Sequence, residues 1–193
     1  MIILASGSNR RIELLKDAGV QFRVIPSLVE EDFSNDLSPE ENVKQVALKK
    51  AVDIFSKNKD SFVIAADTIV VYNNEIFGKP TDEDDAFNIL KRLSNKTHKV
   101  MTAVAILKEG VEDVFLSTTK VTFKDLSDEE IWEYVDTKEP FGKAGAYAIQ
   151  GIGKDIVDTF DGCFFTVVGL PLKEVLNRIN KYTKTPQEWG VLT

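Results

Sequence analysis

The spacing of apolar residues alternates between strand-like and helix-like stretches along the chain. Continuous or alternating apolar runs predict strands at residues 2–5, 22–26, 62–72, 76–77, 99–107, 114–123, 147–149 and 156–160. Apolar residues at helical spacing predict one helix after Ser8 and another from about Pro171 to Asn180. The tail from Tyr182 to Thr193 shows no periodicity. Strands that alternate with helices in this way predict an α/β fold with a mixed sheet.

Helix-start signals predict three further helices. Ser38–Glu41, Thr81–Asp84 and Ser127–Glu130 each resemble a capping box, in which a hydroxyl side chain and a later acidic side chain satisfy free backbone N–H groups. Pro39 falls at the first helical position, where its missing N–H costs nothing. Two turns, Asn73-Asn74 and Glu109-Gly110, predict hairpins that join neighbouring strands.

Composition narrows the class of protein. A chain of 193 residues can bury one sizeable core, so a single domain over residues 1–193 is expected. The net charge of −7 argues against a duplex nucleic-acid binder, which needs a basic face. The longest apolar stretch is too short to span a membrane, and the start does not resemble a signal peptide, so a cytoplasmic location is expected. The single cysteine excludes an internal disulfide and a multi-thiolate zinc site, and the single histidine argues against a histidine metal cluster.

Asp67 interrupts the most apolar segment of the chain. Residues 63–71 are apolar on both sides of this one carboxylate, which is the pattern of a strand buried on both faces. A buried charge is costly unless a cation or a metal compensates it. Asp67 is therefore a candidate metal ligand or general base; the alternative is an aspartate that caps a turn at the end of a strand.

Lys50 interrupts the apolar face of a predicted helix in the same way. It shares one helix face with apolar residues at helical spacing: Val43, Val46, Ala47, Ala51 and Ile54. A lysine drawn inward to meet phosphate fits this position. A lysine that reaches solvent from the edge of the apolar stripe fits it as well.

Four other segments carry candidate binding residues. Ser6–Arg11 joins a strand to a helix and offers free N–H groups and two guanidinium groups for phosphate, although a plain serine cap with solvated arginines has the same pattern. Gly78-Lys79-Pro80 is a rigid turn that would hold a lysine in place. The acidic run 30–32 offers oxygen ligands for a hard cation such as Mg²⁺. Gln150, beside Gly151, is either a reader of a base edge or a buried glutamine with satisfied hydrogen bonds.

Taken in order, these segments resemble the Maf family of nucleoside triphosphate pyrophosphatases. The resemblance runs from Leu4 to about Ile179 and rests on an ordered set of stretches rather than on one motif. The stretches are Leu4–Leu15, Ala65–Val70, Gly78-Lys79-Pro80, Leu93–Val104, Lys138–Gly151 and Val168–Leu172. Three positions depart from the usual pattern: Asn9 replaces a proline, and Asn95 and Ala148 each replace a glycine.

The resemblance implies a fold and an activity. It implies a mixed twisted sheet with flanking helices and two lobes around a central cleft that holds the active site, in the Maf/ITPase-like manner, and often a homodimer. It implies hydrolysis of a nucleoside triphosphate between the α and β phosphates, dependent on Mg²⁺, Mn²⁺ or Co²⁺. The family is also linked to arrest of septum formation and of cell division, and to the clearing of modified nucleotides.

The resemblance also implies residue roles. Asp67 matches the catalytic proton acceptor, and with Glu31 it is expected to hold the metal. Ser8, Arg11, Lys50 and Lys79 match positions that contact phosphate. Arg10, Thr68 and Gln150 match the positions that distinguish the dTTP/UTP pyrophosphatase subgroup from the subgroup that acts on 7-methyl-GTP.

Three functions are weighed on this basis. The hypothesis that the residues favour is a metal-dependent enzyme that converts dTTP and UTP to the monophosphate and pyrophosphate, with Asp67 helping to deprotonate the attacking water. A nucleotide-binding regulator of septum formation without turnover is the first alternative. The same reaction on 7-methyl-GTP or ITP is the second.

Overall fold

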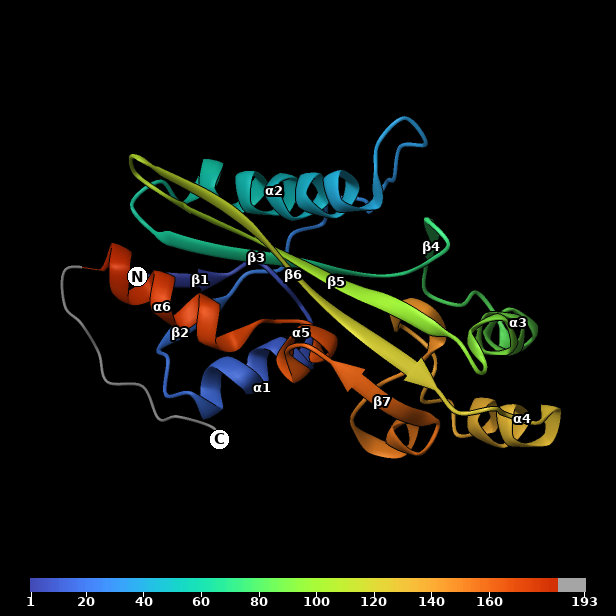
Figure 1. Cartoon of the computed structure of the whole chain (residues 1–193). Helices are drawn as coiled ribbons and strands as arrows, with labels where there is room; N and C mark the ends of the chain where they lie inside the picture. The colour runs from blue at the N-terminus through green and yellow to red at the C-terminus, as the bar shows by residue number, and fades with distance from the viewer. Residues whose placement is uncertain (184–193) are drawn as a thin grey trace. The chain divides into compact units, whose positions relative to one another are not determined.

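The computed structural model describes residues 1–183 (Figure 1). The rest of the tail, for which the sequence shows no periodicity, lies outside the described residues. In this part of the chain, seven strands form one sheet in the order β2-β1-β3-β5-β6-β7, with β4 paired to β3. The elements in chain order are β1 (Ile2–Leu4), α1 (Asn9–Asp17), β2 (Phe22–Val24), α2 (Pro39–Lys57), β3 (Phe62–Tyr72), β4 (Glu75–Phe77), α3 (Glu83–Leu93), β5 (Thr97–Lys108), β6 (Val111–Phe123), α4 (Asp128–Asp136), the 3₁₀ turns η1 (Ala144–Ala146) and η2 (Gly151–Asp155), β7 (Val157–Asp161), α5 (Phe164–Val168) and α6 (Leu172–Tyr182).

The sheet is mixed, as the alternating pattern predicts. β1 pairs in parallel with β2 and with β3, whereas β4 pairs antiparallel with β3 and β7 pairs antiparallel with β6. Parallel neighbours need a crossover connection. In the sequence, α1 connects β1 to β2, and α2 connects β2 to β3. The predicted α/β class with a mixed sheet and flanking helices is therefore confirmed.

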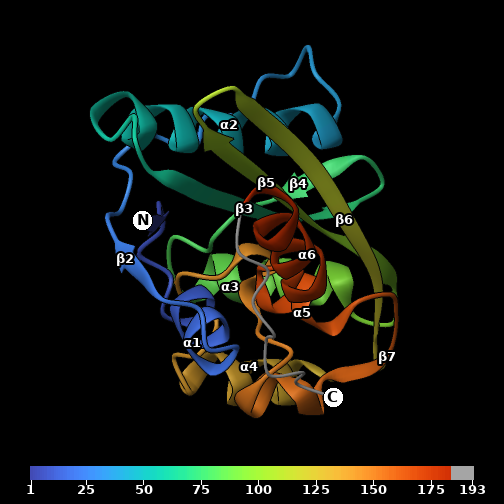
Figure 2. The same cartoon turned by 90° about the vertical axis from the view of Figure 1, so that its left-hand side faces the viewer.

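The described chain divides into two compact units. Unit 1 consists of Met1–Asp67, Thr102–Ser117 and the described chain from Gly169, and unit 2 consists of Thr68–Met101 and Thr118–Val168. β3, β5 and β6 contribute residues to both units. In unit 1, α2 lies on one side of the strands and α6 on the other, as two perpendicular views show (Figures 1 and 2).

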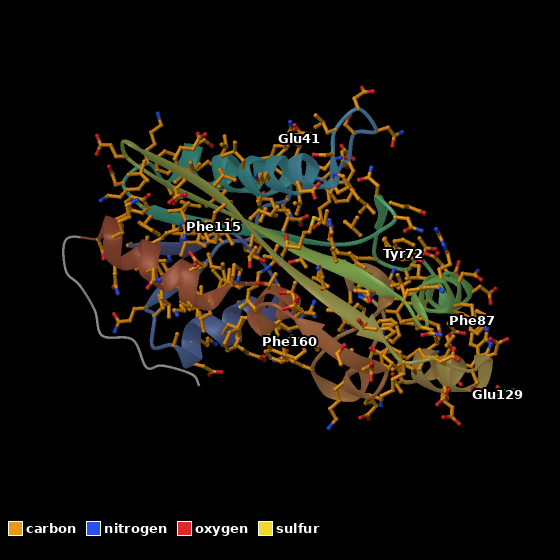
Figure 3. The ribbon with its side chains drawn as sticks, in the orientation of Figure 1. Glu41, Tyr72, Phe87, Phe115, Glu129 and Phe160 are labelled. Atoms are coloured by element: carbon orange, nitrogen blue, oxygen red, sulfur yellow. The ribbon has the colours of Figure 1, made fainter. Side chains whose placement is uncertain are left out.

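Unit 2 contains a helical layer in which α3 lies against α4. Phe87 of α3, labelled in Figure 3, stacks on Trp132 of α4 with ring centroids 4.7 Å apart. An ion pair between Lys91 and Asp128 also links the two helices. Among residues 1–183, no helix combines the length and the apolar character that a membrane span requires.

Two of the three predicted capping boxes are confirmed, and one is shifted. The Ser38 hydroxyl accepts from the Glu41 N–H at 3.2 Å while the Glu41 carboxylate accepts from the Ser38 N–H at 2.9 Å, and the box at Ser127 closes in the same way. The prediction of Thr81 as a cap is wrong. Asp82 caps α3, because its carboxylate accepts from the Asp85 N–H at 2.8 Å.

The hairpin predictions are confirmed, but the predicted strand at 147–149 is wrong. Asn73 and Asn74 both adopt positive φ, of 51° and 64°, as a two-residue turn between β3 and β4 requires. Residues 147–149 are buried yet lie in an irregular segment between η1 and η2. The Ala148 N–H donates to the Tyr134 hydroxyl at 3.2 Å, so a side chain takes the place of a partner strand. The helix α5 has no counterpart in the sequence prediction.

A buried aromatic cluster in unit 2 holds the single histidine. His98 is 1% exposed, and its Nε2 lies 2.9 Å from the Tyr147 hydroxyl. The ring also meets Phe123 edge to face, with centroids 4.8 Å apart. Its Nδ1 is buried without a hydrogen-bond partner. Burial lowers the pKa of His98 from 6.5 to about 4, so His98 is neutral in the folded chain at neutral pH.

His98 therefore makes the stability of the chain depend on pH. The unfolded chain takes up a proton below pH 6.5, whereas folded His98 stays neutral down to about pH 4, so its contribution is complete above 6.5 and is lost as the pH falls to 4. At roughly 1.4 kcal/mol for each pH unit, the loss is about 3 kcal/mol. We expect His98→Gln, which keeps a polar side chain but does not titrate, to reduce the pH slope of the free energy of unfolding in urea. Equal slopes for both proteins between pH 7 and pH 4 would contradict this account.

Candidate active site

Asp67 lies on β3, where the flanking strand residues from Phe62 to Val71 are almost all buried. The residue is 3% exposed. Its Oδ1 accepts a hydrogen bond from Lys50 Nζ at 2.7 Å, and its Oδ2 is buried without a hydrogen-bond partner. The prediction that this carboxylate lies in a strand buried on both faces is confirmed. A carboxylate with one oxygen paired and the other unpartnered is able to accept a proton or to ligate a cation.

Lys50 supplies the compensating positive charge. α2 turns the side chain inward, and the residue is 7% exposed. Its Nζ donates to Asp67 Oδ1 at 2.7 Å and to Glu31 Oε1 at 2.8 Å. The Glu31 side chain is 34% exposed and comes from the segment between β2 and α2. Thus one ammonium group bridges two carboxylates of unit 1, and the alternative of a solvent-directed Lys50 is wrong.

The electrostatics of Asp67 combine opposing effects. Burial raises the pKa of Asp67 above its ordinary value of 3.8, because the charged form loses hydration. The charge and hydrogen bond of Lys50 and the charge of Arg11 lower the pKa of Asp67, whereas the charge of Glu31 raises it. The net direction is upward. A carboxylate with a raised pKa is a stronger base once it is ionised, which suits proton transfer from water.

Arg11 is buried, and three of its hydrogen bonds go to oxygens of the chain. It is 8% exposed, and Nε donates to the Gly169 carbonyl at 2.7 Å. Nη1 donates to the Ala66 carbonyl at 2.8 Å and to the Ser6 hydroxyl at 3.0 Å. The Ala66 carbonyl immediately precedes Asp67 in β3. Arg11 therefore fixes the backbone that carries the candidate base, and desolvation lowers the pKa of its guanidinium.

The start of α1 has features that favour an anion. Ser8 is the N-cap, with extended backbone angles, but its side chain makes no capping hydrogen bond, and the first turn of the helix has no acidic residue. The Ser8 N–H donates to the Ser6 hydroxyl at 3.3 Å. Arg10, half-buried, is the second residue of the helix. A helix start with N–H groups and a nearby cation favours phosphate.

Unit 2 carries the other three predicted residues. Thr68 is half-buried on β3, Lys79 is exposed between Gly78 and Pro80, and Gln150 is exposed just before η2. The alternative of Gln150 as a buried glutamine is wrong. Gly145 links these segments, because its N–H donates to the Gly78 carbonyl at 2.9 Å.

Gly145 also lies against β3. It adopts a φ of 69°, and a Cβ at this position would lie 2.7 Å from a methyl carbon of Val70, two residues beyond Thr68. The loop that leads to Gln150 is thus bound to the turn that carries Lys79 and packed on the strand that carries Thr68.

Three residues of this arrangement have no role of their own in the sequence prediction. Ser6 and Gly169 supply acceptors for Arg11, and Tyr134 supplies the hydroxyl that binds Ala148. Ser6 and Gly169 lie in stretches that carry the family resemblance, so a signal for them was present in the sequence. Nothing in the sequence pattern around Tyr134 distinguishes it from an ordinary core residue of α4.

The unit 1 carboxylates fit a hard divalent cation that is shared with a substrate. Asp67 Oδ2 is an unpartnered buried oxygen, and the Lys50 bridge brings Glu31 to the same place. Within residues 1–183, no group of three or more histidine, cysteine, aspartate or glutamate side chains could by itself hold a metal ion. Mg²⁺ is commonly held by one or two carboxylates together with substrate phosphates and water, so two carboxylates suffice.

We expect Arg11→Lys to destabilise the chain. A lysine has no planar fork and cannot reach all three acceptors, so at least one buried carbonyl loses its charged donor. The expected loss in the free energy of unfolding is about 2 kcal/mol, measured by urea denaturation. Arg23→Lys, at an exposed position of β2, is the matched control and should change stability by less than about 0.5 kcal/mol. Equal effects of the two substitutions would show that the Arg11 hydrogen bonds contribute no stability.

Comparison with known proteins places the chain in a family. A family model described as Maf-like protein matches residues 1–182. A dTTP/UTP pyrophosphatase of Caldicellulosiruptor bescii is 52% identical over 177 residues, covering 89% of each chain. Proteins of the same name from Caldicellulosiruptor saccharolyticus and Halalkalibacterium halodurans are 47% and 46% identical and cover 93% and 92% of this chain and 94% of their own.

Among solved structures, the Staphylococcus aureus Ham1 protein aligns with a TM-score of 0.48 at 20% identity, over 81% of this chain and 79% of that chain. That likeness is too low to transfer structural detail or activity. The family model and the relatives agree with each other over nearly the full length. The chain belongs to the Maf family.

Proposed function

We propose that this chain is a nucleoside triphosphate pyrophosphatase that converts dTTP and UTP to the monophosphate and pyrophosphate. The observation that carries the proposal is the buried Asp67 carboxylate, which has a raised pKa, one oxygen on Lys50 and one oxygen unpartnered. The relatives named dTTP/UTP pyrophosphatase support the same reaction and the same bases.

Asp67 and Glu31 would hold a divalent cation, Mg²⁺, Mn²⁺ or Co²⁺. Such a cation, when bound, polarises phosphoryl oxygens and lowers the pKa of bound water. The two carboxylates already share one ammonium group, so their charges are gathered at one place before substrate binds. The exposed position of Glu31 leaves this side of the cluster open to a ligand.

Asp67 acts as the general base in the proposed reaction. A water molecule gives a proton to the Asp67 carboxylate while its oxygen forms a bond to the α phosphorus. The bond from the α phosphorus to the bridging oxygen breaks, and pyrophosphate leaves with the electron pair. Arg11 contributes by holding the Ala66 carbonyl, and with it the strand segment that carries Asp67.

The cations stabilise the charge that moves onto pyrophosphate. We assign this role to Lys50, Lys79 and Arg10, together with the N–H groups and the Ser8 hydroxyl at the start of α1. Arg11 matches a phosphate position of the family, but the hydrogen bonds of its Nε and Nη1 support a structural contribution in this chain.

Thr68 and Gln150 select the base, and Arg10 contributes to the same choice. Both Thr68 and Gln150 offer hydrogen-bonding groups that a pyrimidine edge can satisfy, and a mismatched base would leave these groups unpaired. Homodimer formation, two lobes with the active site in a cleft, and the clearing of modified nucleotides remain predictions from the family resemblance. A single domain over residues 1–193 and a cytoplasmic location remain predictions from the sequence itself.

The reaction is tested by measuring pyrophosphate release from dTTP, UTP, CTP, ATP, GTP, ITP and 7-methyl-GTP in the presence of Mg²⁺. We expect dTTP and UTP to be hydrolysed with the highest kcat/KM. Asp67→Asn should lower kcat for dTTP by about 10²- to 10⁴-fold, the usual range for removal of a general base. The control is Asp60→Asn, at an exposed position before β3, which should leave kcat unchanged.

The possible outcomes separate the candidate functions. If dTTP binds in equilibrium dialysis but no protein releases pyrophosphate, the chain is a nucleotide-binding regulator and not an enzyme. If 7-methyl-GTP or ITP is the best substrate, the reaction stands and the assignment to the dTTP/UTP subgroup is wrong. Full turnover by Asp67→Asn would remove Asp67 from the role of base.

Lys50 should set the pH at which the enzyme becomes active. Its charge and hydrogen bond lower the pKa of Asp67, so in Lys50→Met the pKa of Asp67 rises further. Because the base works only when ionised, kcat/KM for dTTP should fall at a higher pH in the variant than in the parent as the solution is acidified. A variant whose activity is lower at every pH, with the acid limb unmoved, would show that Lys50 contributes only to binding phosphate.

A further inference from the structure

The carboxylate of Glu139, which is not one of the two carboxylates that Lys50 bridges, binds the segment that carries Gln150. Glu139 follows α4 and accepts three hydrogen bonds from unit 2. Its Oε2 accepts from the Gly153 N–H at 2.7 Å and from the Tyr134 hydroxyl at 2.8 Å, and its Oε1 accepts from the Ile152 N–H at 3.1 Å. Charged acceptors make the stronger class of hydrogen bond.

Tyr134 links Glu139 to the backbone on the other side of Gln150. Its hydroxyl donates to Glu139 and accepts from the Ala148 N–H at 3.2 Å. Tyr134 lies on α4 and is 3% exposed, so packing around its side chain holds the hydroxyl in place. The backbone is therefore fixed two residues before Gln150 and again two and three residues after it. We call Glu139 and Tyr134 the loop clamp.

The two glycines of this segment leave space for the loop clamp. Gly151 has a φ of 71°, and a Cβ there would lie 2.2 Å from Glu139 Oε1. A Cβ at Gly153 would lie 2.1 Å from the Ala148 carbonyl oxygen and 2.6 Å from the Tyr134 hydroxyl oxygen. Side chains at these positions would force the carboxylate and the hydroxyl away from the backbone that they bind.

Gln150 itself is left available. It is the residue before η2, it is exposed, and its side chain does not cap that turn. The loop clamp binds only backbone N–H groups around it, so the backbone is fixed while the amide group remains free of the clamp. Binding groups held in advance in their productive position lose less entropy when a ligand arrives.

We propose that Glu139 is a positioning residue for base selectivity, which it exerts through Tyr134 and the backbone around Gln150. This inference rests on the proposed function, in which Gln150 reads the pyrimidine. Glu139 does not touch the substrate in this proposal. It fixes the direction in which the amide of Gln150 is offered.

Glu139→Gln tests the proposal with the least change in shape. Glu139 accepts at both oxygens, so one end of a glutamine would point an NH₂ donor at a backbone or tyrosine donor. We expect KM for dTTP to rise about tenfold with kcat within about twofold, because a ground-state contact is lost. The constants for GTP should be unchanged, so the preference for dTTP over GTP falls about tenfold.

Four further variants make the test specific. Tyr134→Phe breaks the same grip from the other side and should shift KM for dTTP in the same direction. Glu133→Gln, an exposed glutamate of α4, is the matched control and should change nothing. In the double variant Glu139→Gln/Gln150→Ala, the loss of selectivity should equal that of Gln150→Ala alone, because Glu139 acts through Gln150.

Four contrary results would overturn the proposal, and they differ from one another in what they measure. A parallel fall in kcat for dTTP and GTP would make Glu139 a merely structural residue. Additive losses in the double variant would show that Glu139 does not act through Gln150. A selective parent whose Glu139→Gln variant stays equally selective overturns this inference alone. A parent that hydrolyses dTTP and GTP equally well overturns the proposed function and, with it, this inference.

Discussion

The buried carboxylate of Asp67 is the feature on which the rest of unit 1 depends. An ionised group within an apolar strand loses its hydration, and that loss destabilises the fold unless a cation lies against it. Lys50 meets this requirement with a 2.7 Å contact, and it can do so because α2 turns one charged residue toward the sheet within an otherwise apolar face. The pair is a constraint as much as a source of stability, since loss of either partner leaves the other buried and uncompensated.

The same constraint explains the position of Arg11. Its charge lowers the pKa of Asp67, while its hydrogen bonds hold the Ala66 and Gly169 carbonyls, which lie 55 and 158 residues away in the chain. A planar guanidinium presents its donors in a rigid fork, whereas an ammonium group is a compact charge at the end of a flexible stem. The element that fixes the backbone next to the base therefore also stabilises its charge. Stability and basicity at Asp67 are set by one small group of side chains.

In unit 2, side-chain hydrogen bonds hold a segment that has no regular secondary structure. The segment around Gln150 is irregular, so it lacks the regular ladder of hydrogen bonds that keeps a strand rigid. Glu139 and Tyr134 replace that ladder with side-chain acceptors, and Gly151 and Gly153 admit them. Buried His98 and Tyr147 anchor the preceding residues from within the core. Rigidity here comes from a few polar contacts rather than from secondary structure.

The sequence by itself determined the features that depend on near neighbours. The capping boxes at Ser38 and Ser127 and the turn at Asn73-Asn74 are local, and the structure agrees with all three predictions. Asp67 and Lys50 were visible as charges that break an apolar pattern, because burial of a charge is an anomaly that one strand or one helix face reveals. The cap of α3 was misplaced by one residue because Thr81 and Asp82 are both good caps, and local chemistry does not decide between them.

Only the tertiary structure decided which groups meet. The apolar run 147–149 has the composition of a strand, but its backbone is bound by the Tyr134 hydroxyl and not by a neighbouring strand. Likewise, an arginine beside a helix start looks the same in sequence whether it faces a phosphate or the carbonyl of Gly169. Such contacts depend on how distant segments approach each other in space, and hydrophobic periodicity records only whether a residue is buried, not what it is buried against.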